Sequence, residues 1–145
     1  MILKEIMTPS PEAVDANDSL QKTAERMQSL DVGIFPVRDE NEIVGVVTDR
    51  DMVVRGMADQ LDPQTTQVKQ IMTDQALSMH LDTDLHEAVT SMEQQQVRRL
   101  LVVDDQKNVV GIVSLGDIAV RSSEDLAGEA LEKVSDPTQP DRVGP

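Results

Sequence analysis

The chain contains no cysteine, and of its 145 residues only Phe35 is aromatic. Without cysteine the protein cannot form a disulfide, a zinc–thiolate site or a thiolate nucleophile. A single aromatic side chain cannot provide the platform on which proteins stack the successive bases of single-stranded nucleic acids. A binding site in this protein must therefore be built mainly from aliphatic, hydroxyl and charged side chains.

Positive charge is also scarce, because 13 Lys and Arg residues oppose 27 Asp and Glu residues, giving a formal net charge of −14. Phosphate backbones are bound by clustered Lys and Arg, so we expect no nucleic-acid partner. No apolar run approaches the roughly 18 residues that span a bilayer. The first residues lack the charged and apolar regions of a secretion signal. We therefore expect a cytoplasmic protein with no membrane partner.

What the sequence does contain is an internal repeat. Residues 3–8 (LKEIMT) return as residues 68–73 (VKQIMT), which places Met72 at an offset of 65 from Met7. After one extra residue in the turn at 104–108, the offset becomes 66. At this second offset Gly45, Thr48, Asp51 and Arg55 match Gly111, Ser114, Asp117 and Arg121. Such self-similarity at a fixed spacing indicates two copies of one folding unit.

The repeat predicts the boundaries of the domains. We expect the first repeat within residues 1–60, a linker at 61–67 and the second repeat at 68–123. Ser122 and Asp125 resemble a capping box, which predicts a short helix at the start of 124–145. The remainder of that segment has the composition of a disordered tail.

Each copy is expected to begin with an extended lead-in followed by an amphipathic helix. In the first copy Asn17 or Asp18 could cap the helix. Its predicted apolar stripe consists of Leu20, Ala24, Met27 and Leu30. In the second copy the helix would start at Asp82 or Thr83. Its predicted stripe consists of Leu85, Val89 and Met92. The spacing of three and four residues places each stripe on one helical face.

Two apolar runs and a second helix complete each copy. Runs at 34–37 and 43–47 flank a polar turn, and the counterparts are 100–103 and 109–113. β-Branched runs around a short polar turn predict hairpins. The second helices are predicted from near Asp51 to a stop at Gly56, and from Asp117 through Arg121.

The order of these motifs resembles a known family. Ile-Met-Thr, an amphipathic helix, a strand ending in Asp and then Gly-x-Val-Thr/Ser-x-x-Asp are similar to the cystathionine-β-synthase (CBS) domain. The tandem arrangement, from about Leu3 to Arg121, resembles a stand-alone bacterial CBS pair, or Bateman module. The resemblance implies an α+β fold of two repeats, each β-α-β-β-α, related by a pseudo-twofold axis. Small sheets would pack on helices.

The resemblance also implies a function. CBS pairs bind adenosine-containing ligands (AMP, ADP, ATP, S-adenosylmethionine, sometimes NAD) in clefts between their repeats. They regulate other proteins rather than catalyse reactions, and they commonly form homodimers. We therefore expect no catalytic residue, no metal site and no required cofactor, with an adenine nucleotide as regulatory ligand and a separate effector protein. The alternative is a structural protein-interaction module whose clefts hold no ligand.

Hydroxyl and carboxylate side chains lie where a strand is expected to give way to a helix. Thr48 could bind a phosphate or ribose oxygen, and Asp51 could accept hydrogen bonds from both ribose hydroxyls. Ser114 and Asp117 offer the same groups in the second copy. Backbone N–H groups at these helix starts would suit a phosphate. The alternative is that all four residues only cap helices, because Ser, Thr and Asp are preferred there.

The family alignment suggests which residues would contact the base. One side of each base site would be formed by residues that follow the Met-Thr segment, which are Ala13 and Val14 in the first copy and Leu77 and Met79 in the second. The opposite wall would be formed by Ile34, Phe35 and Pro36 in the first copy and by Arg99 and Leu100 in the second. Arg50, Arg98 and Arg99 are candidates for the phosphate, although Arg98 and Arg99 could instead form surface ion pairs. Leu115 and Gly116 replace Asp49 and Arg50, so the two sites need not be equivalent.

Overall fold

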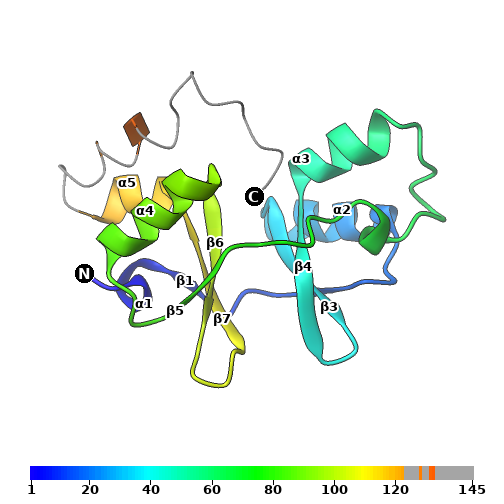
Figure 1. Ribbon diagram of the computed structural model, residues 1–145. Helices are drawn as coiled ribbons and strands as arrows, with labels where there is room; N and C mark the ends of the chain where they lie inside the picture. Colours follow the sequence, from blue (N-terminus) through cyan, green and yellow to red (C-terminus); the bar gives the residue numbers. More distant parts are fainter. Residues whose placement is uncertain (123–127, 129–130, 133–145) are drawn as a thin grey trace. The chain divides into compact units, whose positions relative to one another are not determined.

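The computed structural model describes residues 1–122, 128 and 131–132. The chain is an α+β protein in which small sheets pack against short helices, as expected (Figure 1). The helix and tail predicted within 124–145 lie almost entirely outside the described residues. No helix in the described part of the chain has both the length and the apolar character needed to cross a bilayer.

The chain forms two compact units. Unit 1 comprises Met1–Pro11 and the described residues from Leu77 onward, and unit 2 comprises Glu12–Ala76. These units do not coincide with the sequence repeats. Each unit combines the Ile-Met-Thr lead-in of one repeat with the helices and hairpin of the other.

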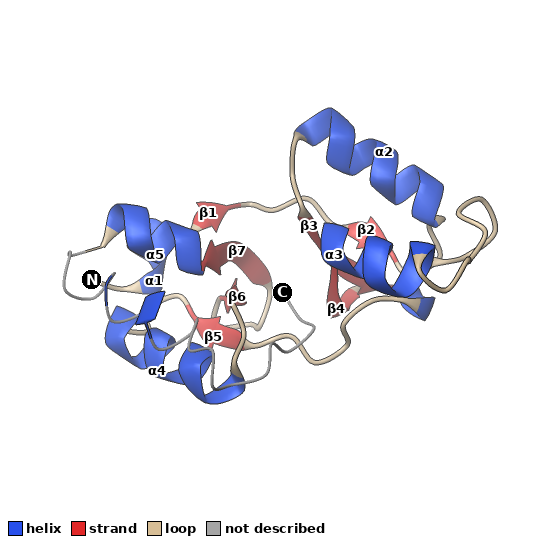
Figure 2. Ribbon diagram, turned by 90° about the horizontal axis from the view of Figure 1, so that it is seen from above, coloured by secondary structure: helices blue, strands red, loops and turns tan. Residues whose placement is uncertain are grey.

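Unit 1 is built on a four-stranded sheet of order β1-β7-β6-β5 (Figure 2). Strand β5 is parallel to β6, and the other neighbouring pairs are antiparallel. The elements of this unit are α1 (Leu3–Ile6), β1 (Thr8–Pro9), β5 (Ser78–His80), α4 (Leu85–Gln95), β6 (Arg99–Val103), β7 (Val109–Ser114) and α5 (Leu115–Arg121).

Unit 2 is built on a three-stranded sheet of order β2-β3-β4. Thr73 adds a single antiparallel bridge to Val46 of β4, and this matches the pairing of Thr8 in β1 with Ile112 of β7. The elements of this unit are β2 (Val14–Asp15), α2 (Leu20–Leu30), β3 (Ile34–Asp39), β4 (Glu42–Thr48), α3 (Asp49–Asp51), the π-helix η1 (Met52–Met57) and the 3-10 helix η2 (Val68–Gln70).

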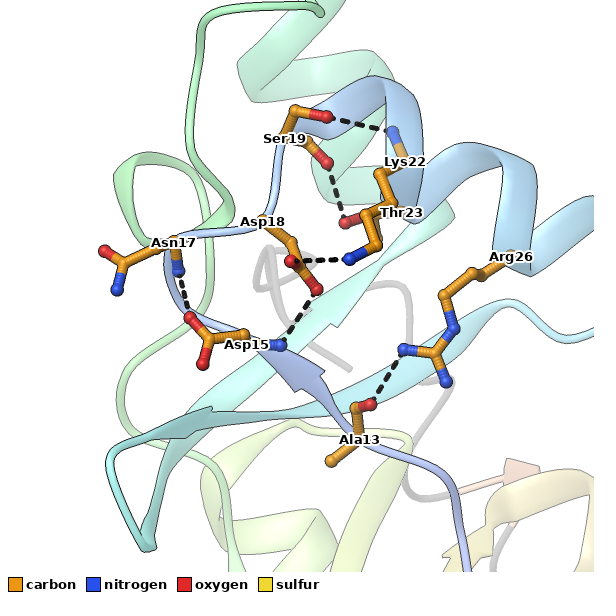
Figure 3. Close-up of polar contacts among 8 residues, drawn as sticks. All are labelled: Ala13, Asp15, Asn17, Asp18, Ser19, Lys22, Thr23 and Arg26. Atoms are coloured by element: carbon orange, nitrogen blue, oxygen red, sulfur yellow. Dashed lines mark hydrogen bonds and ion pairs between the residues drawn. The ribbon is translucent and has the colours of Figure 1, made fainter.

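Both predicted hairpins are confirmed, but the predicted caps of the first helices are wrong. Ser19 caps α2, and its hydroxyl accepts a hydrogen bond from the backbone N–H of Lys22 at 3.1 Å (Figure 3). Asp18 cannot take this role because its carboxylate accepts from the backbone N–H of Asp15. In the second copy the cap is Asp84 rather than Asp82 or Thr83.

The predicted stripe of α2 is also partly wrong. Leu20 and Met27 are buried, whereas Ala24 and Leu30 are exposed and Thr23 takes a place in the interior. The Thr23 hydroxyl donates to the carbonyl oxygen of Ser19 at 2.9 Å. Because this hydrogen bond satisfies the hydroxyl, a threonine can occupy a buried position.

Two further predictions about helices are corrected. Gly56 does not end the second helix of unit 2, because η1 continues to Met57. Gly56 is buried, and a Cβ at this position would lie 3.3 Å from a methyl group of Leu20, so the glycine permits close packing against α2. The lead-ins are not fully extended either. Each contains one helical turn, α1 or η2, which buries Leu3 or Val68.

Each unit has its own apolar core. In unit 1 the core joins α1 and α4 to the sheet, and in unit 2 it joins α2 and η2 to β3 and β4. The lead-in residues are part of these cores. Leu3 and Ile6 are buried in unit 1, and Val68 and Ile71 are buried in unit 2.

Candidate functional site

The Thr-x-x-Asp motif of unit 2 forms a reciprocal cap where β4 meets α3. The Thr48 hydroxyl accepts from the backbone N–H of Asp51 at 3.1 Å, and Asp51 Oδ2 accepts from the backbone N–H of Thr48 at 3.0 Å. Asp51 Oδ1 accepts from the Thr73 hydroxyl at 3.4 Å and lies 4.0 Å from Arg55 Nε. Both carboxylate oxygens are therefore engaged within unit 2, and Asp51 is only 1% exposed.

The matching motif of unit 1 forms the same cap but leaves its carboxylate more accessible. The Ser114 hydroxyl accepts from the backbone N–H of Asp117 at 3.0 Å, and Asp117 Oδ2 accepts from the backbone N–H of Ser114 at 2.8 Å. Asp117 is half-buried. Within the described residues nothing hydrogen-bonds to its second oxygen, Oδ1, which leaves that oxygen available to a ligand.

The capping interpretation is thus correct for both motifs, and it does not exclude binding. A carboxylate has two oxygens with about four acceptor positions, so one oxygen can hold the helix while the other accepts from a ribose hydroxyl. The caps also fix the orientation of both carboxylates at the ends of β4 and β7. The two sites differ in how much of this acceptor capacity is already used.

The predicted base wall of unit 2 is divided between the two faces of its sheet. Ile34 pairs with Thr48 and Pro36 pairs with Val46, whereas Phe35 lies between them in sequence. Because successive side chains of a strand point to opposite faces, Ile34 and Pro36 share one face. Phe35 belongs to the apolar core on the other face, together with Val14 of β2.

Arg26, which the sequence analysis did not select, contacts two of the predicted residues. Its guanidinium lies over the Phe35 ring, 5.0 Å from the centroid. Arg26 Nη1 donates to the carbonyl oxygen of Ala13 at 2.9 Å (Figure 3), and Nη2 lies 3.3 Å from Glu12 Oε2. The sequence carries no signal for this contact, because Arg26 occupies an ordinary polar position on an amphipathic helix.

The predicted wall of unit 1 is aliphatic. Leu77 and Met79 are partly buried against the core of this unit, and Leu100 is buried within it. Arg99 is half-buried and pairs with Ser114 across β6 and β7, which brings one candidate arginine beside the motif.

The two remaining candidate arginines lie at the surface. Arg98 is exposed, and its carbonyl oxygen accepts from the backbone N–H of Leu115 at 2.8 Å. Arg50 is exposed at the start of α3 in unit 2. Arg98 thus precedes β6, the neighbour of the motif strand β7, and Arg50 follows the motif strand β4.

Two more arginines, for which the sequence predicted no role, bind the lead-in segments. In each unit the arginine comes from one repeat and the lead-in comes from the other. Arg55 Nη1 donates to the carbonyl oxygen of Met72 at 3.2 Å, and Arg121 Nη1 donates to that of Ile6 at 2.9 Å. The only sign of this role in the sequence is that the two arginines occupy matching positions in the repeats. The spacing of residues along the chain does not reveal that they bind the carbonyl oxygens of Met72 and Ile6.

The histidines do not form a metal site in the described structure. His80 Nε2 lies 2.7 Å from Asp105 Oδ1, and His80 Nδ1 accepts from the backbone N–H of Asp82 at 3.1 Å. No group of three or more His, Cys, Asp or Glu side chains in the described ranges could hold a metal ion.

Comparison with known proteins identifies related sequences. The family model described as "CBS domain" matches residues 3–56 and 68–124. The CBS domain-containing protein YhcV of Bacillus subtilis is 39% identical over 134 residues, which cover 92% of this chain and 94% of that protein. Hypoxic response protein 1 of Mycobacterium tuberculosis is 30% identical over 135 residues, covering 92% of this chain and 94% of that protein.

Solved structures share the fold. A crystal structure of Hypoxic Response Protein I with two coordinated zinc ions has a TM-score of 0.72 at 30% identity, covering 83% of this chain and 98% of that chain. The CBS domain pair of protein MJ0100, in complex with 5-methylthioadenosine and S-adenosyl-L-methionine, has a TM-score of 0.73 at 26% identity. That match covers 83% of this chain and 94% of that chain.

Proposed function

Because this chain belongs to the CBS domain family and contains two such domains, we propose that it is a regulatory protein that binds adenosine-containing ligands. The candidates are AMP, ADP, ATP, NAD and S-adenosylmethionine. The chain would bind a ligand and regulate another protein rather than catalyse a reaction. The ligand complex described for the CBS pair of MJ0100 supports this class of ligand.

The observation that carries the proposal is the second oxygen of Asp117, Oδ1, which accepts no hydrogen bond from the described residues. Its other oxygen and its backbone N–H are held by Ser114, so the carboxylate is fixed at the end of β7. A fixed, half-buried carboxylate oxygen is a suitable acceptor for a ribose hydroxyl, because the charge strengthens the hydrogen bond and little orientation entropy is lost.

Arginines supply the positive charge that a phosphorylated ligand requires. The chain is strongly acidic overall, yet Arg98 and Arg99 lie at the start of β6, and Arg99 faces Ser114 across the ladder. Arg50 occupies the start of α3 in unit 2. Guanidinium groups can bind phosphate oxygens with two hydrogen bonds, so these residues would favour AMP, ADP or ATP over an uncharged nucleoside.

We further propose that the chain forms a homodimer and transmits its ligand state to a separate effector protein. In each unit the helical segment that follows the motif exposes large apolar side chains. These are Val53, Val54 and Met57 of η1 and Val120 of α5. A ligand that binds one conformation of the pair better than another would shift the population towards it, and an effector would recognise that conformation.

Calorimetric titration with AMP, ATP, NAD and S-adenosylmethionine tests the proposal. We expect at least one of these ligands to bind, and the Asp51→Ala, Asp117→Ala double variant to lose that binding. Asp105→Ala is a matched control, because it removes an exposed aspartate from the turn between β6 and β7. Binding that survives in the double variant would overturn the assignment of these carboxylates.

A second candidate function is a structural protein-interaction module that holds no ligand. The engagement of both Asp51 oxygens within unit 2 favours it, because that carboxylate already has partners without a ribose. A thermal-shift screen that shows no response to any adenosine ligand, combined with capture of a specific protein partner, would support this alternative.

A further inference from the structure

The two motif carboxylates differ in what reaches their second oxygen. In unit 2 the Thr73 hydroxyl donates to Asp51 Oδ1 at 3.4 Å, and Arg55 Nε lies 4.0 Å from the same oxygen. In unit 1 the corresponding oxygen, Asp117 Oδ1, accepts no hydrogen bond and pairs with no cation among the residues that the structure describes. A ribose hydroxyl is also a neutral O–H donor, so the Thr73 hydroxyl already makes the contact with Asp51 that a ribose would make.

The backbone of Thr73 is fixed against β4. Its N–H donates to the carbonyl oxygen of Val46 at 2.8 Å, and its carbonyl oxygen accepts from the backbone N–H of Val46 at 2.9 Å. A Cβ at Gly45 would overlap that carbonyl oxygen, so the two chains approach each other as closely as a glycine permits. Because the residue is held in this way, its hydroxyl loses little orientation entropy when it binds Asp51.

The corresponding threonine of the first repeat makes no such contact. At the repeat offset of 65, Thr73 corresponds to Thr8, and Thr8 pairs with Ile112 as Thr73 pairs with Val46. Thr8 is exposed, and within the described residues no hydrogen bond joins its hydroxyl to Asp117. The same residue type at the same pairing position therefore occupies the carboxylate in unit 2 only.

We propose that the Thr73 hydroxyl closes Asp51 to ligand hydroxyls, so that the chain binds its adenosine ligand through Asp117 and uses Asp51 to hold the lead-in of the second repeat. This inference rests on the proposed function and assigns ligand binding to one of the two motifs. Thr73 is a positioning residue, because it acts through the Asp51 carboxylate. A ligand that must displace a charge-assisted hydrogen bond should bind about 10- to 100-fold more weakly at Asp51 than at Asp117.

Calorimetric titration of the full chain with AMP tests the proposal through the number of sites. We expect one AMP per chain in the unmodified protein, and Asp117→Asn should weaken that binding about 10- to 100-fold. Thr73→Ala should add a second site, because it removes both the hydroxyl and the methyl group from the Asp51 carboxylate. Asp51→Asn combined with Thr73→Ala should abolish the second site, which a purely structural role of Thr73 does not predict.

Matched variants separate the hydroxyl from other effects. Thr8→Ala makes the same change at the corresponding position of unit 1 and should leave one site. Thr73→Ser keeps the hydroxyl and should also leave one site. Thr73→Val removes the hydroxyl with little change of shape, should add the second site, and serves if Thr73→Ala does not fold.

The outcomes distinguish this inference from the proposed function. Two equal sites in the unmodified chain, or a single site in a folded Thr73→Ala or Thr73→Val variant, would overturn the role of Thr73 and leave the proposed function intact. A second site in Thr73→Ser or in Thr8→Ala would also overturn it, because neither variant removes the hydroxyl from Asp51. Absence of binding to every variant, with AMP and with the other adenosine ligands, would overturn the proposed function and this inference with it.

Discussion

The guanidinium of Arg121 donates a hydrogen bond to the carbonyl oxygen of Ile6, 115 positions away in the sequence, at 2.9 Å. Arg121 ends the last helix of the second repeat, and Ile6 ends the helical turn in the lead-in of the first. The contact joins the exchanged segment to unit 1. Arg55 makes the corresponding contact with Met72 in unit 2, so both repeats use the same residue for the same purpose.

Removal of the Arg121 side chain should loosen the first residues of the chain. We expect Arg121→Ala to lower the free energy of unfolding by about 2 kcal/mol, because the carbonyl oxygen of Ile6 loses a charged donor. Hydrogen exchange at Leu3–Ile6 should accelerate more than exchange in α4. Urea denaturation and exchange mass spectrometry measure these effects. Arg50→Ala, which removes an exposed arginine, should change stability by less than about 0.5 kcal/mol; equal losses would contradict the assigned role.

The two repeat glycines should differ in their tolerance of alanine. A Cβ at Gly45 would overlap the carbonyl oxygen of Thr73 and lie 3.1 Å from Asp74 Cα, whereas a Cβ at Gly111 would overlap the Met7 side chain. A flexible methionine can move more easily than a backbone. We therefore expect Gly45→Ala to cost about 3 kcal/mol of unfolding free energy and Gly111→Ala about 1 kcal/mol.

Gly116 provides the control for these two substitutions. It is exposed in α5, and the nearest atom to an added Cβ is Ser114 Oγ at 3.5 Å. Because alanine restricts the unfolded chain and favours a helix, Gly116→Ala should raise the unfolding free energy by about 0.5–1 kcal/mol. Chemical denaturation of the three variants measures their unfolding free energies and so checks the predicted order. A larger loss for Gly111→Ala than for Gly45→Ala would contradict the explanation.

The two motif carboxylates should contribute unequally to stability. Asp51→Ala removes the acceptor of the buried Thr48 N–H and of the Thr73 hydroxyl, and removes the carboxylate that lies 4.0 Å from Arg55 Nε. We expect a loss of about 3 kcal/mol. Asp117→Ala removes one cap contact at a half-buried position, which should cost about 1 kcal/mol. Urea denaturation without ligand measures both losses of unfolding free energy. Equal losses would show that the burial of Asp51 does not increase its contribution to stability.

The exposed apolar side chains of η1 lead to a prediction about assembly. If they form a dimer contact, Val53→Asp combined with Met57→Asp should convert a dimer to a monomer, because association would bury two carboxylates in each partner. Sedimentation equilibrium gives the mass. Gln28→Asp, at an exposed polar position of α2, should leave the dimer intact. A double variant that remains dimeric would exclude η1 from the contact.

Local patterns predicted much of the fold. The repeat, the two hairpins and the position of each Gly-x-Val-Thr/Ser-x-x-Asp motif followed from residue order, because strands and caps depend on near neighbours in the chain. The predicted caps of α2, Asn17 or Asp18, lie two residues and one residue before the observed cap Ser19, and the Asp18 carboxylate instead accepts from the backbone N–H of Asp15. The buried Thr23 was missed because its hydrogen bond to Ser19 satisfies a group that sequence patterns treat as polar.

The sequence by itself determined the family, the two copies and the chemical groups available at each motif. Only the tertiary structure decided that each lead-in packs in the unit of the other repeat and that Arg26 lies over Phe35. It also decided that Asp51 is buried with both oxygens engaged, whereas within the described part of the chain one oxygen of Asp117 has no hydrogen-bond donor. These relationships join residues that are far apart in the chain. Such contacts are selected by packing and hydrogen-bond geometry in three dimensions, which the spacing of residues along one strand or helix does not encode.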